Sequence, residues 1–400
     1  MQLRIVLNIS MVMALACTSP APGPTPNPGG DQLQRQALET FDSALARPAL
    51  EQAVTDFAAL RGAVDGWAQA AAGADGQALT AAKAAFEKAF VTWQRVEVLQ
   101  LGPLGAATQV TAGEGLRDEI YSWPTTNLCR VDTALAANTA PDDAYFATAL
   151  VTSKGLVVLE ELLFNQSSSN SCPANATINT NGSWAALAAS PTLQARRKAW
   201  ALGVARHLEA TARRARDGWS AAGGFGDKLK QAGSMGSLWR TPKDGLDDVY
   251  AGLFYVDRWV KDYKLGAPAG ITPACMAQSC PALAESPRAA LSTKAIVENL
   301  VMARAVFTGS FDTSSNAVSF DDLLVERGAG ALKDEMLQKL DTALAAARAF
   351  ERPVSTAATE DLDGLQALHA AVKAYTDLFK SQFVTTLSLK VPKEGAGDND

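Results

Sequence analysis

The sequence predicts an all-α protein in which two helical bundles follow one another in tandem. Its 400 residues exceed what one small hydrophobic core organises, so two domains are expected. Alanine and leucine are abundant, aromatic residues make up only 7%, and β-branched runs are short, a composition that favours helices over strands. Two successive sets of amphipathic segments then predict the two bundles.

The amino terminus has the features of a bacterial export signal. Arg4 precedes an apolar run, residues 5–16, which is shorter than a comfortable membrane span. This run leads into ALAC, which resembles the box at which lipoproteins are cleaved and lipidated. Residues 1–17 are therefore predicted to be a lipoprotein signal with a membrane anchor at Cys17, and an ordinary cleaved signal peptide is the alternative.

Residues 18–31 are rich in proline and glycine and are predicted to form a tether without a packed core. Thr18 and Ser19, rather than an aspartate, follow the cysteine, which favours the outer membrane. The folded body is expected to face the periplasm or the cell surface.

The first bundle is predicted over residues 32–220, where apolar positions recur at helical spacing. Polar loops rich in glycine or asparagine interrupt it at residues 102–115 and 165–183. The predicted helices are 32–47, 49–73, 76–101, 143–165 and 189–219.

The second bundle is predicted over residues 227–392, after the glycine-rich joint AAGGFG, and residues 393–400 form an acidic tail. Its predicted helices are 227–240, 243–261, 287–309, 331–350 and 356–387.

Four cysteines remain once Cys17 is assigned to the lipid anchor, and an even number in an oxidising compartment predicts two disulfides. Cys275 and Cys280 share one short loop, so local pairing is the simplest connectivity. Cys129 with Cys172 would then close a loop of about 43 residues, stabilising the fold by about 4 kcal/mol in the chain-entropy model. A metal site is the alternative, although a Cys-x4-Cys spacing without a nearby histidine suits zinc poorly.

Glu97 is the first of two carboxylates predicted to face a core. On a helical wheel it falls in the middle of an apolar face, while Arg95 and Lys88 point elsewhere. The apolar residues of this face are Phe86, Phe90, Trp93 and Leu101.

Glu160 is the second, in the stretch KGLVVLEELLF, residues 154–164. It falls between Leu156 and Phe164 on an apolar face. The neighbouring Glu161 falls beside Lys154 and Asn165, on a stripe expected to be solvated.

A buried ionised carboxylate costs several kcal/mol unless it is paired, protonated or bound to a cation. Three outcomes are therefore open. The two glutamates meet arginine or backbone donors as structural groups, share a proton as a pair with raised pKa, or ligate a metal from facing helices.

The low number of histidines and the net charge argue against catalysis by several histidines and against nucleic-acid binding. Of the two histidines, His207 lies among basic residues and is expected at the surface or a helix end, whereas His369 is expected in the core or at a cap. No His-Glu-x-x-His, Gly-x-Ser-x-Gly or phosphate-binding glycine loop occurs. The net charge of -6 and the lack of a basic patch argue against nucleic acid as a partner.

Several segments together resemble the imelysin family of exported bacterial proteins, over about residues 35–400. Trp93 lies in the first of them, and Tyr121 and Trp123 lie in the second. The segments are VTWQRVEVLQLGPLG, LRDEIYSWPTTN, KGLVVLEELLF, KLGAPAG, AESPRAALSTKAIVENLVMARAVFTG and the ending LSLKVPKEGAGDND.

The resemblance implies a signature Gly-x-His-x-x-Glu, of which Gly155 and Glu160 match and Val157 replaces the histidine. Valine supplies no donor atom, so half of the implied ligand pair is missing. The family also implies two helical bundles with a site where they meet, a link to iron uptake, and a peptidase activity attached to its name. Glu285 and Ser286 would face Glu97 and Glu160 from the second bundle.

Three functions follow from these observations. The first is a non-catalytic surface lipoprotein that binds a metal ion or an iron compound. The second is a zinc-dependent metallopeptidase in which Glu160 acts as ligand or general base. The third is a module that binds a protein or peptide between the bundles. An iron or zinc ion is the cofactor to consider.

Overall fold

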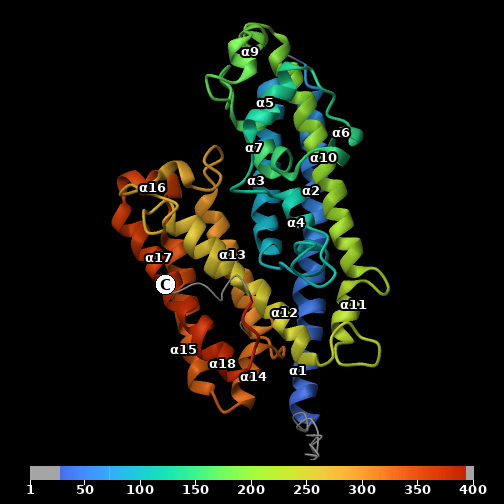
Figure 1. Cartoon of the computed structure of the whole chain (residues 1–400), viewed down its shortest axis with the longest axis vertical. Helices are drawn as coiled ribbons and strands as arrows, with labels where there is room; N and C mark the ends of the chain where they lie inside the picture. Colours follow the sequence, from blue (N-terminus) through green and yellow to red (C-terminus); the bar gives the residue numbers. More distant parts are fainter. Residues whose placement is uncertain (1–27, 72, 313, 393–400) are drawn as a thin grey trace, which may run out of the picture.

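The computed structural model describes residues 28–392 except 72 and 313, and within this part every regular element is a helix (Figure 1). The all-α prediction is confirmed. The predicted signal with Cys17, the tether up to residue 27 and the tail 393–400 lie outside the described residues. None of the described helices is both long enough and apolar enough to cross a bilayer.

Three long helices form the frame of the first half: α2 (Arg47–Ala68), α3 (Asp75–Glu97) and α10 (Thr192–Ser220). Helix α2 packs along both of the others, and α7 (Leu156–Phe164) and α4 (Leu116–Ile120) pack on α10. The remaining short helices of this half are α5 (Leu128–Ala136), α6 (Asp143–Thr148), α8 (Thr177–Thr180), α9 (Ser183–Ala188), α11 (Phe225–Lys230) and the 3-10 turns η2 (Gly102–Leu104) and η3 (Val151–Ser153).

The second half is built around α13 (Ser292–Thr308), α15 (Gly330–Ala349) and α17 (Leu362–Leu378). Helix α12 (Pro242–Tyr255) continues directly into a π-helix, η4 (Val256–Gly266), which packs against α17 and α13. The shorter elements are η5 (Pro281–Leu283), α14 (Phe320–Glu326), α16 (Val354–Glu360), η6 (Phe379–Phe383) and α18 (Val384–Thr386).

The amino-terminal helix α1 (Pro28–Thr40) begins within the predicted tether and packs against α12 and α14 of the second half. A π-helical turn, η1 (Phe41–Ala46), joins it to α2. The two halves also meet where α3 packs on α13, and their buried apolar residues form one continuous cluster. The domain limits 32–220 and 227–392 remain a prediction.

Three predicted helices are interrupted because the backbone leaves the right-handed region. One is 356–387, which divides at Asp361, with φ −152° and ψ 56°, into α16 and α17. The segment 143–165 divides into α6, η3 and α7. Ala149 and Leu150 are extended, which separates α6 from η3. Gly155 has φ 91° and ψ −171° before α7, and a Cβ there would lie 2.5 Å from the Ile120 carbonyl oxygen. The segment 227–240 is helical only to Lys230, and Gly233 and Gly236 adopt φ 80° and 79° beyond it.

Several other helices are shorter than predicted, and for two of them the difference matters for the site. Helix α3 ends at Glu97, so Leu101 belongs to the following loop and not to the helical face of Glu97. Helix α13 begins at Ser292 instead of residue 287, and Ser286 and Ala290 in the preceding turn have φ 46° and 59°.

Both predicted disulfides are confirmed. Cys129 bonds to Cys172 and Cys275 bonds to Cys280, with sequence separations of 43 and 5 residues. The metal alternative for these cysteines is thereby excluded.

Candidate functional site

Glu97 is buried at the end of α3 and accepts hydrogen bonds from both halves of the molecule. Its carboxylate receives Trp93 Nε1 at 3.2 Å, Arg117 Nε at 3.0 Å and the Tyr255 hydroxyl at 2.6 Å. The guanidinium of Arg117 neutralises the charge, and Trp93 lies one helical turn before Glu97 on the same face.

Glu285 is fully buried on the second half and is neutralised by a lysine that is equally buried. Lys264 Nζ lies 2.9 Å from Glu285 Oε1, and it also donates to Gln94 Oε1 at 2.6 Å and Asn299 Oδ1 at 2.8 Å. Tyr121 donates to the same Glu285 oxygen at 2.8 Å. Burial raises the pKa of Glu285 above its ordinary value, although Lys264 opposes this rise.

Glu160 is buried in α7 and is held by backbone amides instead of a side-chain cation. Its Oε1 accepts the N–H groups of Arg288 and Ala289, both at 2.8 Å. The left-handed residues Ser286 and Ala290 shape the turn that presents these amides. Burial raises the pKa of Glu160 to about 7, with the two amides lowering it and the nearby Glu285 charge raising it.

Tyr121 connects the three glutamates. Burial and the charges of Glu285, Glu97 and Glu160 all raise the pKa of its phenol, which therefore stays protonated and donates to Glu285. Ser286 lies next to this cluster, close enough for its hydroxyl to lower the pKa of Glu160. The structure thus gathers Glu97, Glu160, Glu285 and Ser286 at the junction of the halves.

The solvated stripe predicted around Glu161 is wrong. The side chain of Glu161 is only 11% exposed and pairs with Arg288 across the junction, at 3.0 Å. Lys154 precedes α7 instead of belonging to it, and its buried ammonium binds the Phe146 carbonyl and the Glu119 carboxylate. The single helix assumed over 143–165 misplaced Lys154, whereas Glu161 is covered because Arg288 reaches it from the other half.

His207 is also placed differently from the prediction. Its ring stacks on Phe146 with 5.1 Å between centroids, and its Nε2 lies 3.2 Å from Glu119 Oε2. Burial acts to raise the pKa of Glu119, but His207 and Lys154 outweigh it and keep that pKa below its ordinary value. His369 is buried, as expected for a core residue.

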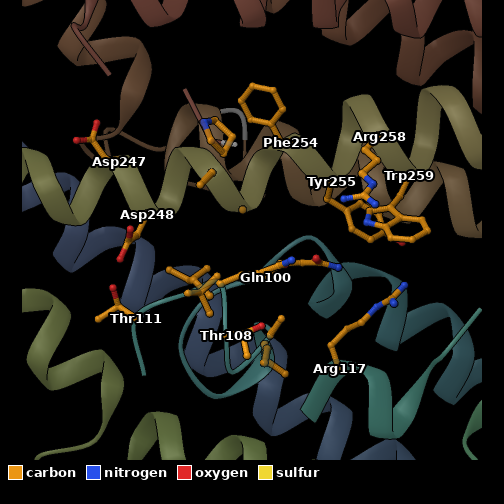
Figure 2. A pocket seen from close by; sticks show the side chains of 18 of the residues that line it. Gln100, Thr108, Thr111, Arg117, Asp247, Asp248, Phe254, Tyr255, Arg258 and Trp259 are labelled. Atoms are coloured by element: carbon orange, nitrogen blue, oxygen red, sulfur yellow. The ribbon is translucent and has the colours of Figure 1, made fainter. Parts of the chain in front are cut away.

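A cleft of about 830 Å³ lies between the two halves, with the loop after α3 on one side and α12 with η4 on the other (Figure 2). Asp247 and Asp248 lie toward one end, whereas Arg117, Arg258 and Trp259 lie toward the other (Figure 2). The apolar part of the wall includes Leu101, Leu104, Ala251, Gly252 and Phe254.

The cleft reaches the buried glutamates through Arg117 and Tyr255, which line it and also hydrogen-bond to Glu97. Trp259 packs near Trp123, with 6.5 Å between ring centroids. Trp123, one of the residues named from the sequence, therefore contacts a residue of the cleft wall. Sequence reasoning missed Arg117, Tyr255 and Lys264. A helical wheel describes one helix, whereas these residues meet the glutamates from elements far away in the chain.

The family model for imelysin matches residues 46–382. The chain belongs to the imelysin family. An imelysin-like protein from Psychrobacter arcticum 273-4 has a similar structure, with a TM-score of 0.68, 18% identity, and coverage of 90% of this chain and 97% of that one. A "putative iron-regulated protein A precursor" from Parabacteroides distasonis ATCC 8503 gives a TM-score of 0.66, 16% identity, and coverage of 88% and 95%. No protein of curated function matches the chain.

The residues of this imelysin-family chain do not fit a catalytic zinc ion. Zinc in hydrolases takes three protein ligands and keeps one open position. Within residues 28–392, less the two gaps, no group of three or more His, Cys, Asp and Glu residues could hold a metal. Val157, which supplies no donor atom, is partly buried and packs against the core. Glu97 and Glu285 already pair with Arg117 and Lys264.

Proposed function

We propose that this imelysin-family protein is a non-catalytic binding protein for a metal ion or an iron compound, which it takes up in the cleft between its halves. The cleft carries this proposal. It has the volume of a small-molecule site, an apolar wall, and polar groups of both signs at its two ends. The buried Glu97 beside it then acts as a structural group that fixes Arg117 and Tyr255 in its wall.

Two further observations support this function. One solved relative is described as a "putative iron-regulated protein A precursor", which links this fold to iron in another organism. In addition, each carboxylate predicted as a ligand already receives protein donors, with only Glu285 Oε2 lacking a partner among the described residues. A cargo would therefore bind in the open cleft rather than displace these donors.

We further propose that the protein is exported and held at the outer membrane by a lipid on Cys17. The two disulfides support export because they persist in oxidising compartments. Mass spectrometry of the membrane fraction tests the anchor: the mature chain should begin at a diacylated Cys17, and a Cys17→Ala variant should lose the lipid. A mature chain that begins elsewhere without a lipid contradicts this assignment.

Calorimetric titration of metal-stripped protein tests the binding function. The probes are ferric citrate and the ferrous, zinc and calcium ions. The Ala251→Trp variant places an indole in the cleft, and Ala251→Ser is its matched control. We expect at least one iron probe to bind the parent and the serine variant, with binding lost in the tryptophan variant. Absence of binding, or equal binding by all three proteins, would overturn the proposal.

A cleavage assay separates this function from the peptidase alternative. Unfolded substrates incubated with the zinc-loaded protein should remain intact, because the residues at the junction do not supply a zinc ligand set. Cleavage that stops when a chelator is added, and that Glu160→Gln abolishes, would favour the peptidase. Peptide binding that competes with the iron probe would favour the interaction module.

A further inference from the structure

Arg117 has one guanidinium nitrogen that the protein leaves without an acceptor. Its Nε donates to Glu97 and its Nη1 donates to Asp118 at 2.9 Å. Its Nη2 is buried and has no hydrogen-bond partner among the described residues, although the side chain lines the cleft and is only 9% exposed. A buried donor without an acceptor costs about 1–3 kcal/mol, so an oxyanion in the cleft would relieve a cost already present.

Arg258 brings a second guanidinium to the same end of the cleft. It is exposed, and it forms no ion pair within the part of the chain that the structure describes. Its guanidinium carbon and that of Arg117 each lie 5.1 Å from the centre of the Trp259 ring. Figure 2 shows Arg117, Arg258 and Trp259 grouped at this end of the cleft, so a ligand bound here would meet both cations.

The opposite end of the cleft offers no comparable pair of groups. Asp247 already accepts from Lys243 at 2.8 Å and from the Lys390 amide at 2.9 Å, and Asp248 accepts from Trp239 Nε1 at 2.8 Å. These carboxylates are committed to the protein itself. Other donors line the cleft, among them the exposed Lys390 and also Gln100, whose Nε2 has no partner among the described residues. The pair of guanidiniums lies at the arginine end, beside the flat aromatic surface of Trp259.

We propose that Arg117, Arg258 and Trp259 form a binding site for the carboxylate group of a small organic anion. Guanidinium groups bind carboxylates through parallel N–H donors, and the apolar wall nearby suits the organic part of such a molecule. This inference rests on the proposed cleft function and names the ligand class: an organic carboxylate, free or as the chelator of an iron ion. The half-exposed Asp118 competes for Arg117 and limits the affinity.

Titration of the full chain with citrate, ferric citrate and inorganic phosphate tests the site. We expect Arg258→Gln to weaken citrate binding by about five- to tenfold, because it removes one exposed charge-assisted contact. Arg206→Gln, an exposed arginine on α10 that does not line the cleft, should have no effect. Asp118→Asn should strengthen binding about threefold, since the competing charge is lost.

Arg117→Lys retains a cation opposite Glu97 but removes the free Nη2 donor, so we expect about tenfold weaker citrate binding and a thermal midpoint close to that of the parent protein.

The outcomes separate the two proposals. If citrate binds without iron and Arg258→Gln weakens it, the carboxylate site stands even if iron is not the cargo.

If ferric citrate binds but Arg258→Gln and Arg117→Lys leave it unchanged, the cleft function stands and the carboxylate site is refuted. Phosphate binding as tight as citrate binding, or no citrate binding at all, also refutes it.

Discussion

Each of the three buried glutamates is neutralised in a different way. Glu97 meets a guanidinium, Glu285 meets an ammonium, and Glu160 meets only backbone amides. A partner cation stabilises the charged form of a carboxylate far more than two amides do once water is excluded. Glu160, whose pKa burial raises to about 7, therefore changes its protonation near neutral pH.

Glu160→Gln should alter the pH dependence of stability. The folded pKa, about 7, lies above the ordinary value of 4.5, so the folded state retains a proton that the unfolded state loses. Glu160 therefore costs stability progressively as pH rises from about 4.5 to 7, on the order of 3 kcal/mol in total. Glutamine keeps an oxygen for the amides and does not ionise.

Urea denaturation between pH 4.5 and 8 measures this effect. The unfolding free energy of Glu160→Gln relative to the parent should increase across this interval and then level off. A difference that is constant with pH would mean that Glu160 does not titrate in the folded state over this range.

Lys264→Met should destabilise the protein by about 3–5 kcal/mol, because Glu285 is left as an uncompensated buried acid. The double variant Lys264→Met, Glu285→Gln should recover a large part of this loss, since Tyr121 can still donate to the amide oxygen. Equilibrium denaturation of both variants provides the measurement. Additive losses in the double variant would show that the two groups are not coupled.

At the level of elements, Gly155 determines where α7 begins. Its φ and ψ, 91° and −171°, lie in a region that is essentially restricted to glycine, and the Ile120 carbonyl leaves no space for a Cβ. Gly115, at the start of α4, is a matched control: its φ is 70°, but a Cβ would meet nothing within 4 Å.

Gly155→Ala should cost about 3 kcal/mol or more, whereas Gly115→Ala should cost about 1 kcal/mol. Thermal denaturation followed by circular dichroism compares the two variants directly. Equal losses would mean that the close approach to Ile120 contributes nothing. The glycine of the signature motif therefore has a structural explanation that does not involve a ligand.

The sequence predicted the inward direction of Glu97 and Glu160 because a helix sets side-chain direction locally; both are at most 2% exposed. It could not predict their partners, since Arg117 and Tyr255 reach Glu97 across 20 and 158 residues. It also did not identify Lys264, because the predicted helix ended at residue 261, whereas the π-helix η4 continues to Gly266. The predicted helix began at residue 287, five residues before α13, so the sequence did not indicate that the Arg288 N–H donates to Glu160.

At the level of the whole molecule, the two disulfides should differ in their contribution. Because loop length sets the entropy lost by the unfolded chain, removing Cys129–Cys172 should cost about 4 kcal/mol and removing Cys275–Cys280 about 2 kcal/mol. Paired cysteine-to-serine variants, compared by urea denaturation, measure the difference. The reverse order would show that local packing outweighs the chain entropy.

The polar contacts between the halves are buried and involve several elements. Gln94 of α3 meets Lys264 and Asn299, Tyr121 meets Glu285, and Glu160 meets the turn before α13. A hinge motion that separated the halves would break all of these buried hydrogen bonds together. We therefore expect the mouth of the cleft to keep a constant width, so that cargo enters and leaves past the rim side chains without any hinge motion.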